Sequence, residues 1–403
     1  MAQCQTGGIR QMQRQSFHQG FIAWAMGTLA LLMGCGTARR HVTEDTSVQV
    51  PTTWQDARVG DRVEYAFYAQ GGSSRGSSAS AGQLFVEVIS VQSPWVWLSI
   101  RVTRNDGQPH PHPFLSHDYV LPVRMGQAPA HPPPGIEGSV PVRIRAFAAG
   151  HRWLAQRTSR DESMGDGPTQ HRIYAEPPGP LYLTRGLLEV SFSGGFFTMS
   201  HHRLALVSFQ RGSGTSGGRP PVMGNPWGPG TWYETLERAS WGDVRKRVCL
   251  GAEQGYLLRK VLEKPRDEVR CEDFQGAEVV ALEDALIHLV NDSVYIPTWQ
   301  PRDYGAPLPR KVRVQLGQAS VVAYLEEAPA PQNGGASWMR SRSYPTDLWS
   351  PVLQGLPMEV RFDRLSEGVY RQSDGGAREY RSDSRLIRWG TWLESPELST
   401  SAR

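Results

Sequence analysis

Apolar and polar residues alternate along many short stretches of this chain, and a period of two predicts β-strands. In residues 61–68, Val63, Tyr65 and Phe67 share one face of the predicted strand. Such strands have one face in a core and one face in water. By pattern and composition we expect further strands at 84–91, 95–102, 140–147, 187–192, 203–209, 244–250, 256–262, 312–316, 320–325, 358–362 and 384–389.

Helical periodicity is sparse. Residues 277–289 are compatible with a short helix, but 278–282 equally fit a strand. The 42 Gly and 30 Pro residues leave little room for long helices. We therefore expect a mainly β protein, built as antiparallel sandwich-like or barrel-like lobes with long Gly/Pro loops and little helix.

Two tracts rich in Gly interrupt the pattern. Residues 71–82 are Ser, Gly and Ala apart from Arg75, typical of a mobile hairpin loop, and 211–230 are rich in Gly, Pro and Ser, typical of a linker. The composition predicts one β domain over 51–210, the linker at 211–230 and a second β domain over 231–395. The polar residues 35–50 predict a flexible tether, and 396–403 a disordered tail.

The N-terminal segment is typical of an export signal. Residues 1–34 contain no Asp or Glu, carry Arg10 and Arg14, and end in an apolar run over 21–34. That run is shorter than the ~20 apolar residues that span a bilayer, but it fits the charged and apolar regions of a secretory signal peptide. Translation can begin at Met1 or Met12.

The residues Leu32-Met33-Gly34-Cys35 close this segment and resemble the lipobox of bacterial lipoproteins. The resemblance implies that Cys35 is lipidated, with palmitate-type acyl chains, and that the chain is cut after residue 34. Gly36 occupies the position at which enteric inner-membrane lipoproteins carry Asp. An outer-membrane anchor is therefore expected, with the body facing the periplasm or the cell surface.

Composition and charge exclude several classes. Hydrophobic residues at 39% and charged residues at 20% exclude a wholly disordered chain. The 43 Lys+Arg against 39 Asp+Glu give a net charge of +4, interspersed along the chain. No nucleic-acid footprint is visible, and we expect neither a nucleic-acid partner nor a cofactor.

Two cysteines remain in the body, Cys249 and Cys271. In an oxidising compartment an isolated pair predicts a disulfide rather than a metal site. We expect a three-stranded meander over 244–274 with one cysteine on each outer strand.

Histidines and sequence motifs offer weak candidates for chemistry. His110 and His112 form an H-x-H, with His117 five residues later, but the intervening prolines are also typical of a solvated loop, and we assign no metal site. The glycine motif at 212–217 is followed by prolines instead of a helix. The serine motifs at 72–76 and 214–218 lie in Gly-rich tracts that do not hold a catalytic triad. We assign no catalytic residue.

Tryptophans and carboxylates leave two alternatives open. Trp95, Trp97 and Trp232 are candidates for stacking on sugar rings, although Trp most often packs in a β core. Glu234, Glu237 and Asp243 are carboxylates of the type that glycosidases use, but sequence spacing does not place two of them across a cleft. A carbohydrate-binding or peptidoglycan-binding protein and an envelope hydrolase are thus alternatives.

The stretch W-x-x-A-x-V-G-D-R-V-E-Y from Trp54 to Tyr65, together with the lipobox and the Trp-rich β pattern, is similar to uncharacterised lipoproteins of myxobacterial-type genomes. That similarity implies no activity and no catalytic residue. The favoured expectation is a lipid-anchored envelope protein with a non-enzymatic binding or structural role. Its expected partners are the membrane, through the anchor, and an envelope protein or glycan.

Overall fold

The fold is taken from a computed structural model, which describes residues 52–73, 76–112, 115–131, 134–161, 169–194, 200–214, 216–220, 225–239, 242–265, 271, 273–295, 310–329, 337–353, 355–357, 360, 365–371 and 380–393. Chain contacts divide the protein into Met1–Glu44 and Asp45–Arg403, and all described residues belong to the second unit. The predicted signal peptide, Cys35, the predicted tether and the predicted tail lie outside the described residues.

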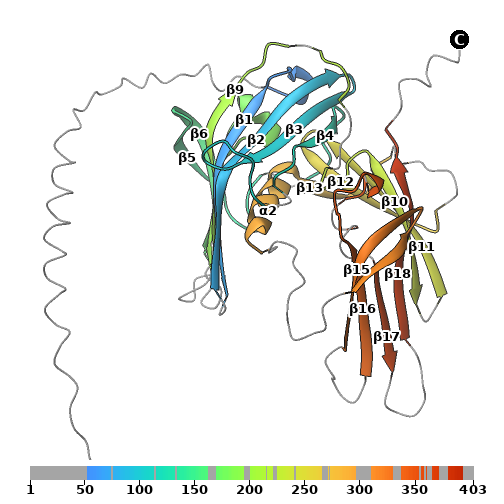
Figure 1. The fold of residues 1–403 in the computed structure, drawn as a ribbon. Coiled ribbons are helices and arrows are strands. Elements are labelled where there is room, and N and C mark those ends of the chain that lie inside the picture. Colours follow the sequence, from blue (N-terminus) through green and yellow to red (C-terminus); the bar gives the residue numbers. More distant parts are fainter. Residues whose placement is uncertain are drawn as a thin grey trace, which may run out of the picture. The chain divides into compact units, whose positions relative to one another are not determined.

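The protein is mainly β with antiparallel pairing and a sandwich-like architecture, which confirms the predicted class. Nine of the described strands form a first antiparallel sheet, and Figure 1 shows it curving around a single labelled helix. In spatial order these strands are β5 (Val142–Ala148), β6 (His151–Asp161), β7 (Thr169–Ala175), β8 (Leu187–Gly194), β9 (Ser200–Gln210), β1 (Arg62–Ser73), β2 (Gly76–Gln92), β3 (Trp95–Thr103) and β4 (Tyr119–Arg124).

Nine further described strands form a second antiparallel sheet, joined to the first by one parallel bridge between Arg124 and Glu253. Their described pairings run from β13 to β12, β11, β10, β18, β17, β16, β15 and β14. The bounds are β10 (Thr231–Ala239), β11 (Gly242–Glu253), β12 (Tyr256–Glu263), β13 (Glu278–Ala281), β14 (Arg310–Leu316), β15 (Ala319–Pro329), β16 (Ser337–Pro345), β17 (Leu365–Arg371) and β18 (Tyr380–Thr391).

The structure bears on three local predictions and overturns the loop expected at 71–82. The tract 71–82 is no loop: β1 and β2 pair through it as far as Ser73 opposite Gly76, and residues 74 and 75 lie outside the described part. The strand and the helix that 277–289 could form are both present, one after the other: β13 ends at Ala281 and helix α2 (Leu282–Tyr295) begins at the next residue. The strand expected at 358–362 falls outside the described residues except for Val360, which is in a helical turn.

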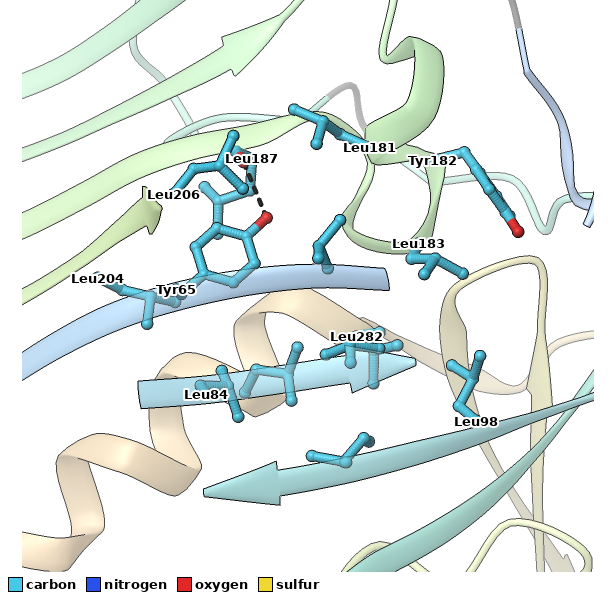
Figure 2. Packing of buried hydrophobic residues seen from close by; sticks show 14 of the residues in the cluster. Tyr65, Leu84, Leu98, Leu181, Tyr182, Leu183, Leu187, Leu204, Leu206 and Leu282 are labelled. Atoms are coloured by element: carbon cyan, nitrogen blue, oxygen red, sulfur yellow. Dashed lines mark hydrogen bonds between the residues drawn. The ribbon is translucent and has the colours of Figure 1, made fainter. Parts of the chain in front are cut away.

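Helix α2 supplies the core of the first sheet. Leu282, Leu286 and Val290 recur every four residues, so they line one helix face, and all three are buried with the inner face of β1. Figure 2 shows Leu282 packed near Leu84 of β2 and several apolar side chains of neighbouring strands. The first sheet is therefore filled by a segment that lies far along the chain. Among the described residues, no helix is long and apolar enough to cross a membrane.

Tyr65 anchors polar groups within this apolar core. Its hydroxyl donates to the carbonyl oxygen of Leu187 over 2.8 Å (Figure 2) and lies 2.6 Å from the hydroxyl of Thr184. Both partners lie at the short helical turn Gly179–Thr184 and the start of β8. The phenol thus satisfies its polar tip while its ring fills the core.

Asp61 ties Arg211 and Gly212 to the first sheet. Its buried carboxylate accepts hydrogen bonds from the hydroxyl of Tyr182 at 2.7 Å and from the backbone N–H of Gly212 at 2.8 Å. It also forms a 2.6 Å ion pair with Arg211. Within the predicted linker 211–230, these described residues are therefore packed against the first sheet. The domain boundary proposed there stays a prediction.

Glu283 is an ionisable group inside the first core. Its side chain is 1% exposed, and its Oε1 lies 3.2 Å from Nη1 of Arg185. Burial raises the pKa of Glu283 to about 7, with Arg185 opposing the shift and Asp284 adding to it. Acidic residues in the first turn of a helix are favoured by the helix dipole, but that gain does not offset the loss of hydration here.

We predict that Glu283 makes the protein less stable as the pH rises. Its pKa in the folded state is raised above the unfolded value of 4.5, so the folded state favours the protonated form. As the pH rises above 4.5, the free energy of unfolding therefore falls until Glu283 is ionised in the folded state as well. A pKa of about 7 implies a loss of about 2 kcal/mol between about pH 5.5 and pH 8. Urea unfolding at both pH values measures it.

The matched variant is Glu283→Gln, which keeps the shape and cannot ionise. The difference in unfolding free energy between this variant and the wild type should grow in favour of the variant as the pH rises. A difference that is the same at both pH values would contradict the prediction.

Candidate functional site

A cluster of opposite charges lies on the face of the second sheet where β10, β11 and β18 are neighbours. Glu234 of β10 stands opposite Arg247 of β11 and Arg388 of β18. Arg245 lies two residues before Arg247, on the same face of β11. Two strands, β11 and β18, thus direct three arginines at one carboxylate of β10.

The carboxylate of Glu234 is completely enclosed. Arg247 contacts Oε1 through Nε at 2.7 Å and Nη2 at 2.5 Å, while Arg245 donates to Oε2 from Nε at 2.9 Å and Nη2 at 2.6 Å. Arg388 reaches Oε2 from Nε at 2.9 Å and Oε1 from Nη2 at 3.2 Å. Glu234 is 0% exposed and Arg247 only 2%. Burying an ionised carboxylate costs free energy unless its oxygens are paired with cations and hydrogen-bond donors, and the three arginines supply that pairing for Glu234.

Trp232 lies beneath two arginines of this ion network. The guanidinium carbons of Arg247 and Arg388 lie 5.7 Å and 5.5 Å from its ring centroid, within the range of cation–π attraction. A Cβ at Gly390 would lie 3.1 Å from Nε1 of this ring. Gly390 therefore lets the indole of Trp232 lie close against β18, and a Cβ there would make a tight contact with the ring.

The electrostatics of Glu234 define what it can do. Burial raises its pKa, but the hydrogen bonds from Arg388, Arg245 and Arg247 outweigh burial, and the pKa of Glu234 is lowered. The group is an ionised carboxylate with its lone pairs occupied, so it is not arranged as a general acid. Nearby Glu237 pairs with Lys246 at 2.7 Å, and we infer that the network is structural.

The three candidate tryptophans have different environments. Trp97 is 1% exposed and packs in the interior with Arg219 above its ring, which makes it unsuited to a sugar platform. Trp95 is half-buried, and its ring centroid lies 5.9 Å from that of Trp392. Trp232 is half-buried beneath its two arginines. These residues do not form one flat exposed surface.

The three candidate histidines serve local contacts. His110 is 6% exposed, lies 3.1 Å from the hydroxyl of Ser80 and accepts a hydrogen bond from the N–H of His112. Burial lowers the pKa of His110 to about 4. His117 contacts Trp349 with ring centroids 3.8 Å apart and ring planes tilted by 35°. Within the described ranges, no three His, Cys, Asp or Glu side chains are placed to hold one metal ion.

The predicted disulfide between Cys249 and Cys271 is present, with Cα atoms 5.5 Å apart. Cys249 lies on β11 as expected, but Cys271 lies in the connection between β12 and β13, not on a third strand. The bond holds that connection against the sheet, where Phe274 occupies the space beside Gly251. A Cβ at Gly251 would lie 2.6 Å from the Phe274 ring.

Sequence reasoning missed the arginine partners of Glu234. Arg245 and Arg247 alternate along a predicted strand, which is a usable signal for a shared charged face. No local pattern connects Arg388 with Glu234, because the two residues are 154 positions apart. The partnership depends on β10 pairing with β18.

Comparison with protein-family models assigns the chain to a family. One model, described as a family of unknown function, matches residues 14–397. The protein belongs to the DUF6068 family. Membership in DUF6068 assigns no activity, and no curated protein matches this chain.

Two solved structures illustrate distant likenesses of this DUF6068 protein. MucB in complex with MucA(peri) is 9% identical, covering 70% of this chain and 86% of that one, with a TM-score of 0.23. A protein of unknown function from the DUF3598 family of Nostoc punctiforme is 10% identical, covering 83% and 100%, with a TM-score of 0.15. At these TM-scores neither likeness informs function.

We predict that Glu234→Gln destabilises the protein by about 3–5 kcal/mol, because it leaves buried arginine charge without its counter-charge. The lowered pKa gives the wild type a stabilising contribution that is full above pH 4.5 and is lost as the pH falls through the lowered value. Urea unfolding at neutral pH measures the loss.

The matched control is Glu237→Gln on the same strand. Glu237 is 38% exposed and pairs with Lys246, so its loss should cost less than about 1 kcal/mol. Equal effects of the two variants would show that the arginine cluster does not depend on Glu234.

We predict that the disulfide contributes about 3 kcal/mol to stability on the chain-entropy model. The double variant Cys249→Ser/Cys271→Ser should lose about that amount in urea unfolding, and a reducing agent should lower the wild type equally. The reducing agent should leave the double variant unchanged. A double variant as stable as the oxidised wild type would contradict the prediction.

Proposed function

We propose that this protein is a lipid-anchored cell-envelope protein that acts by binding or support and not by catalysis. The observation that carries the proposal is the lipobox-like sequence Leu32-Met33-Gly34-Cys35, which overlaps the end of the apolar run 21–34. A thiol at this position is the nucleophile that takes the lipid. An anchor of two or three acyl chains holds a protein stably at a membrane.

The disulfide supports export of the body. Disulfides form and persist in oxidising compartments outside the cytosol. Cys249 and Cys271 are paired and buried, at 1% and 2% exposure, so the bond is a structural element of the fold. An outer-membrane position, facing the periplasm or the cell surface, is the address that fits both features.

The environments of the carboxylates favour a non-catalytic role. Glu234 is an ionised, fully paired group, and Glu237 forms an ion pair. Such groups hold strands together and transfer no proton. A sugar-binding role would need an exposed aromatic platform, and the described environments of Trp97 and Trp232 do not favour one. The partner we favour is therefore an envelope component bound by another surface.

The test of the anchor is Cys35→Ala. In cells fed an alkyne-bearing palmitate analogue, the wild type should be labelled and extracted only by detergent, whereas the variant should lose its label and escape processing. Cys4→Ala is the matched control, because it removes a cysteine on the N-terminal side of the predicted cut and should keep full labelling. Undiminished labelling of Cys35→Ala would refute the proposal.

A further inference from the structure

The hairpin of β5 and β6 presents apolar side chains to solvent. Phe147 is 66% exposed and Leu154 57%. Val142 is 51% exposed, but it stands opposite Arg157 and lies on the other face of the hairpin. Trp153 and Ala155 on the opposite face of β6 are buried. The exposed Phe and Leu therefore lie on the face that the core does not use. The two strands form one end of the first sheet in Figure 1.

The same face is basic. Arg145 lies opposite Leu154 and Arg152 opposite Phe147 in the strand register, and directly opposed residues of antiparallel strands share a face. Arg143 follows on that face, with a side chain that is 87% exposed. Guanidinium groups thus surround the two apolar side chains.

Charge is concentrated here. Residues 140–161 contain five Arg and one Asp, and Arg143, Arg145 and Arg152 lie on this face, whereas the entire chain has a net charge of only +4. Glu176, outside this stretch, lies 3.9 Å from Arg143 and accepts a hydrogen bond from Gln156. Glu176, and Asp161 at the end of β6, therefore place negative charge at the margins of this stretch, whereas Arg145 and Arg152 lie opposite Leu154 and Phe147.

We propose that this hairpin face binds the surface of a bilayer that contains anionic phospholipids. Exposed aromatic and aliphatic side chains enter the interfacial region, and arginines pair with headgroup phosphates. Charge complementarity carries the assignment: the arginines select negatively charged headgroups. The proposal deepens the proposed function and rests on it, since an acyl anchor would keep this face beside a bilayer.

Vesicle binding tests this surface separately from the anchor. The protein without residues 1–35 keeps every described residue, and it should sediment with vesicles of equal parts phosphatidylglycerol and phosphatidylethanolamine. It should not sediment with phosphatidylcholine vesicles. Binding should weaken sharply between about 0.1 and 0.5 M salt, because the Debye length falls from about 10 Å toward 3–4 Å.

The variants give the expected magnitudes. Arg143→Gln/Arg145→Gln/Arg152→Gln should weaken partitioning about a hundredfold, and Phe147→Ser about tenfold. The matched control is Arg310→Gln/Lys311→Gln/Arg313→Gln, which removes three exposed charges from β14 and should change binding less than about threefold. Unchanged urea unfolding of each variant shows that the fold is kept.

The outcomes separate the two proposals. Absence of vesicle binding, or equal weakening by both triple variants, overturns the hairpin assignment while leaving Cys35 lipidation untouched. Binding to polyglutamate but not to vesicles also overturns it, because an acidic polypeptide would then be the preferred partner. Vesicle binding that depends on the hairpin arginines supports it, and the labelling of Cys35 tests the anchor separately.

Discussion

The burial of helix α2 against the first sheet is the packing on which the rest of the fold depends. A curved sheet with a continuous apolar inner face is stable only when another element removes that face from water. Helix α2, which begins at Leu282, packs against this inner face. In the sequence it follows β10 to β13 of the second sheet. The helix therefore makes the two halves of the sequence energetically interdependent.

Two buried glutamates show how charge is handled in the two sheets. Glu234 is enclosed by three arginines, so its ionised form is the stable one, and it joins three strands. Glu283 has one arginine at 3.2 Å and a raised pKa, so its ionised form is held at a cost. Burial is similar at both sites. The number and geometry of the cationic partners decide the difference.

Local pattern predicted much of the fold. The alternation of Val63, Tyr65 and Phe67 marked β1 because a half-buried strand imposes a period of two, and the disulfide followed from two remaining cysteines. The tract 71–82 was misjudged because Gly, Ser and Ala give no alternation even when paired. The strand–helix junction at Ala281 was ambiguous because its apolar residues fit both periods. The Glu234 cluster was invisible, since its geometry arises from tertiary pairing with Arg388.

The delayed arrival of α2 has a consequence for the nascent chain. Strands β1 to β9 are complete once Gln210 has been synthesised, yet the helix that covers their apolar face begins only at Leu282. Over that interval the growing polypeptide carries an uncovered hydrophobic surface, which is a target for chaperones and a hazard for aggregation. The order in which the segments are synthesised therefore constrains folding, in addition to the contacts of the folded state. The core of the first sheet is completed by a helix that is synthesised much later than its strands.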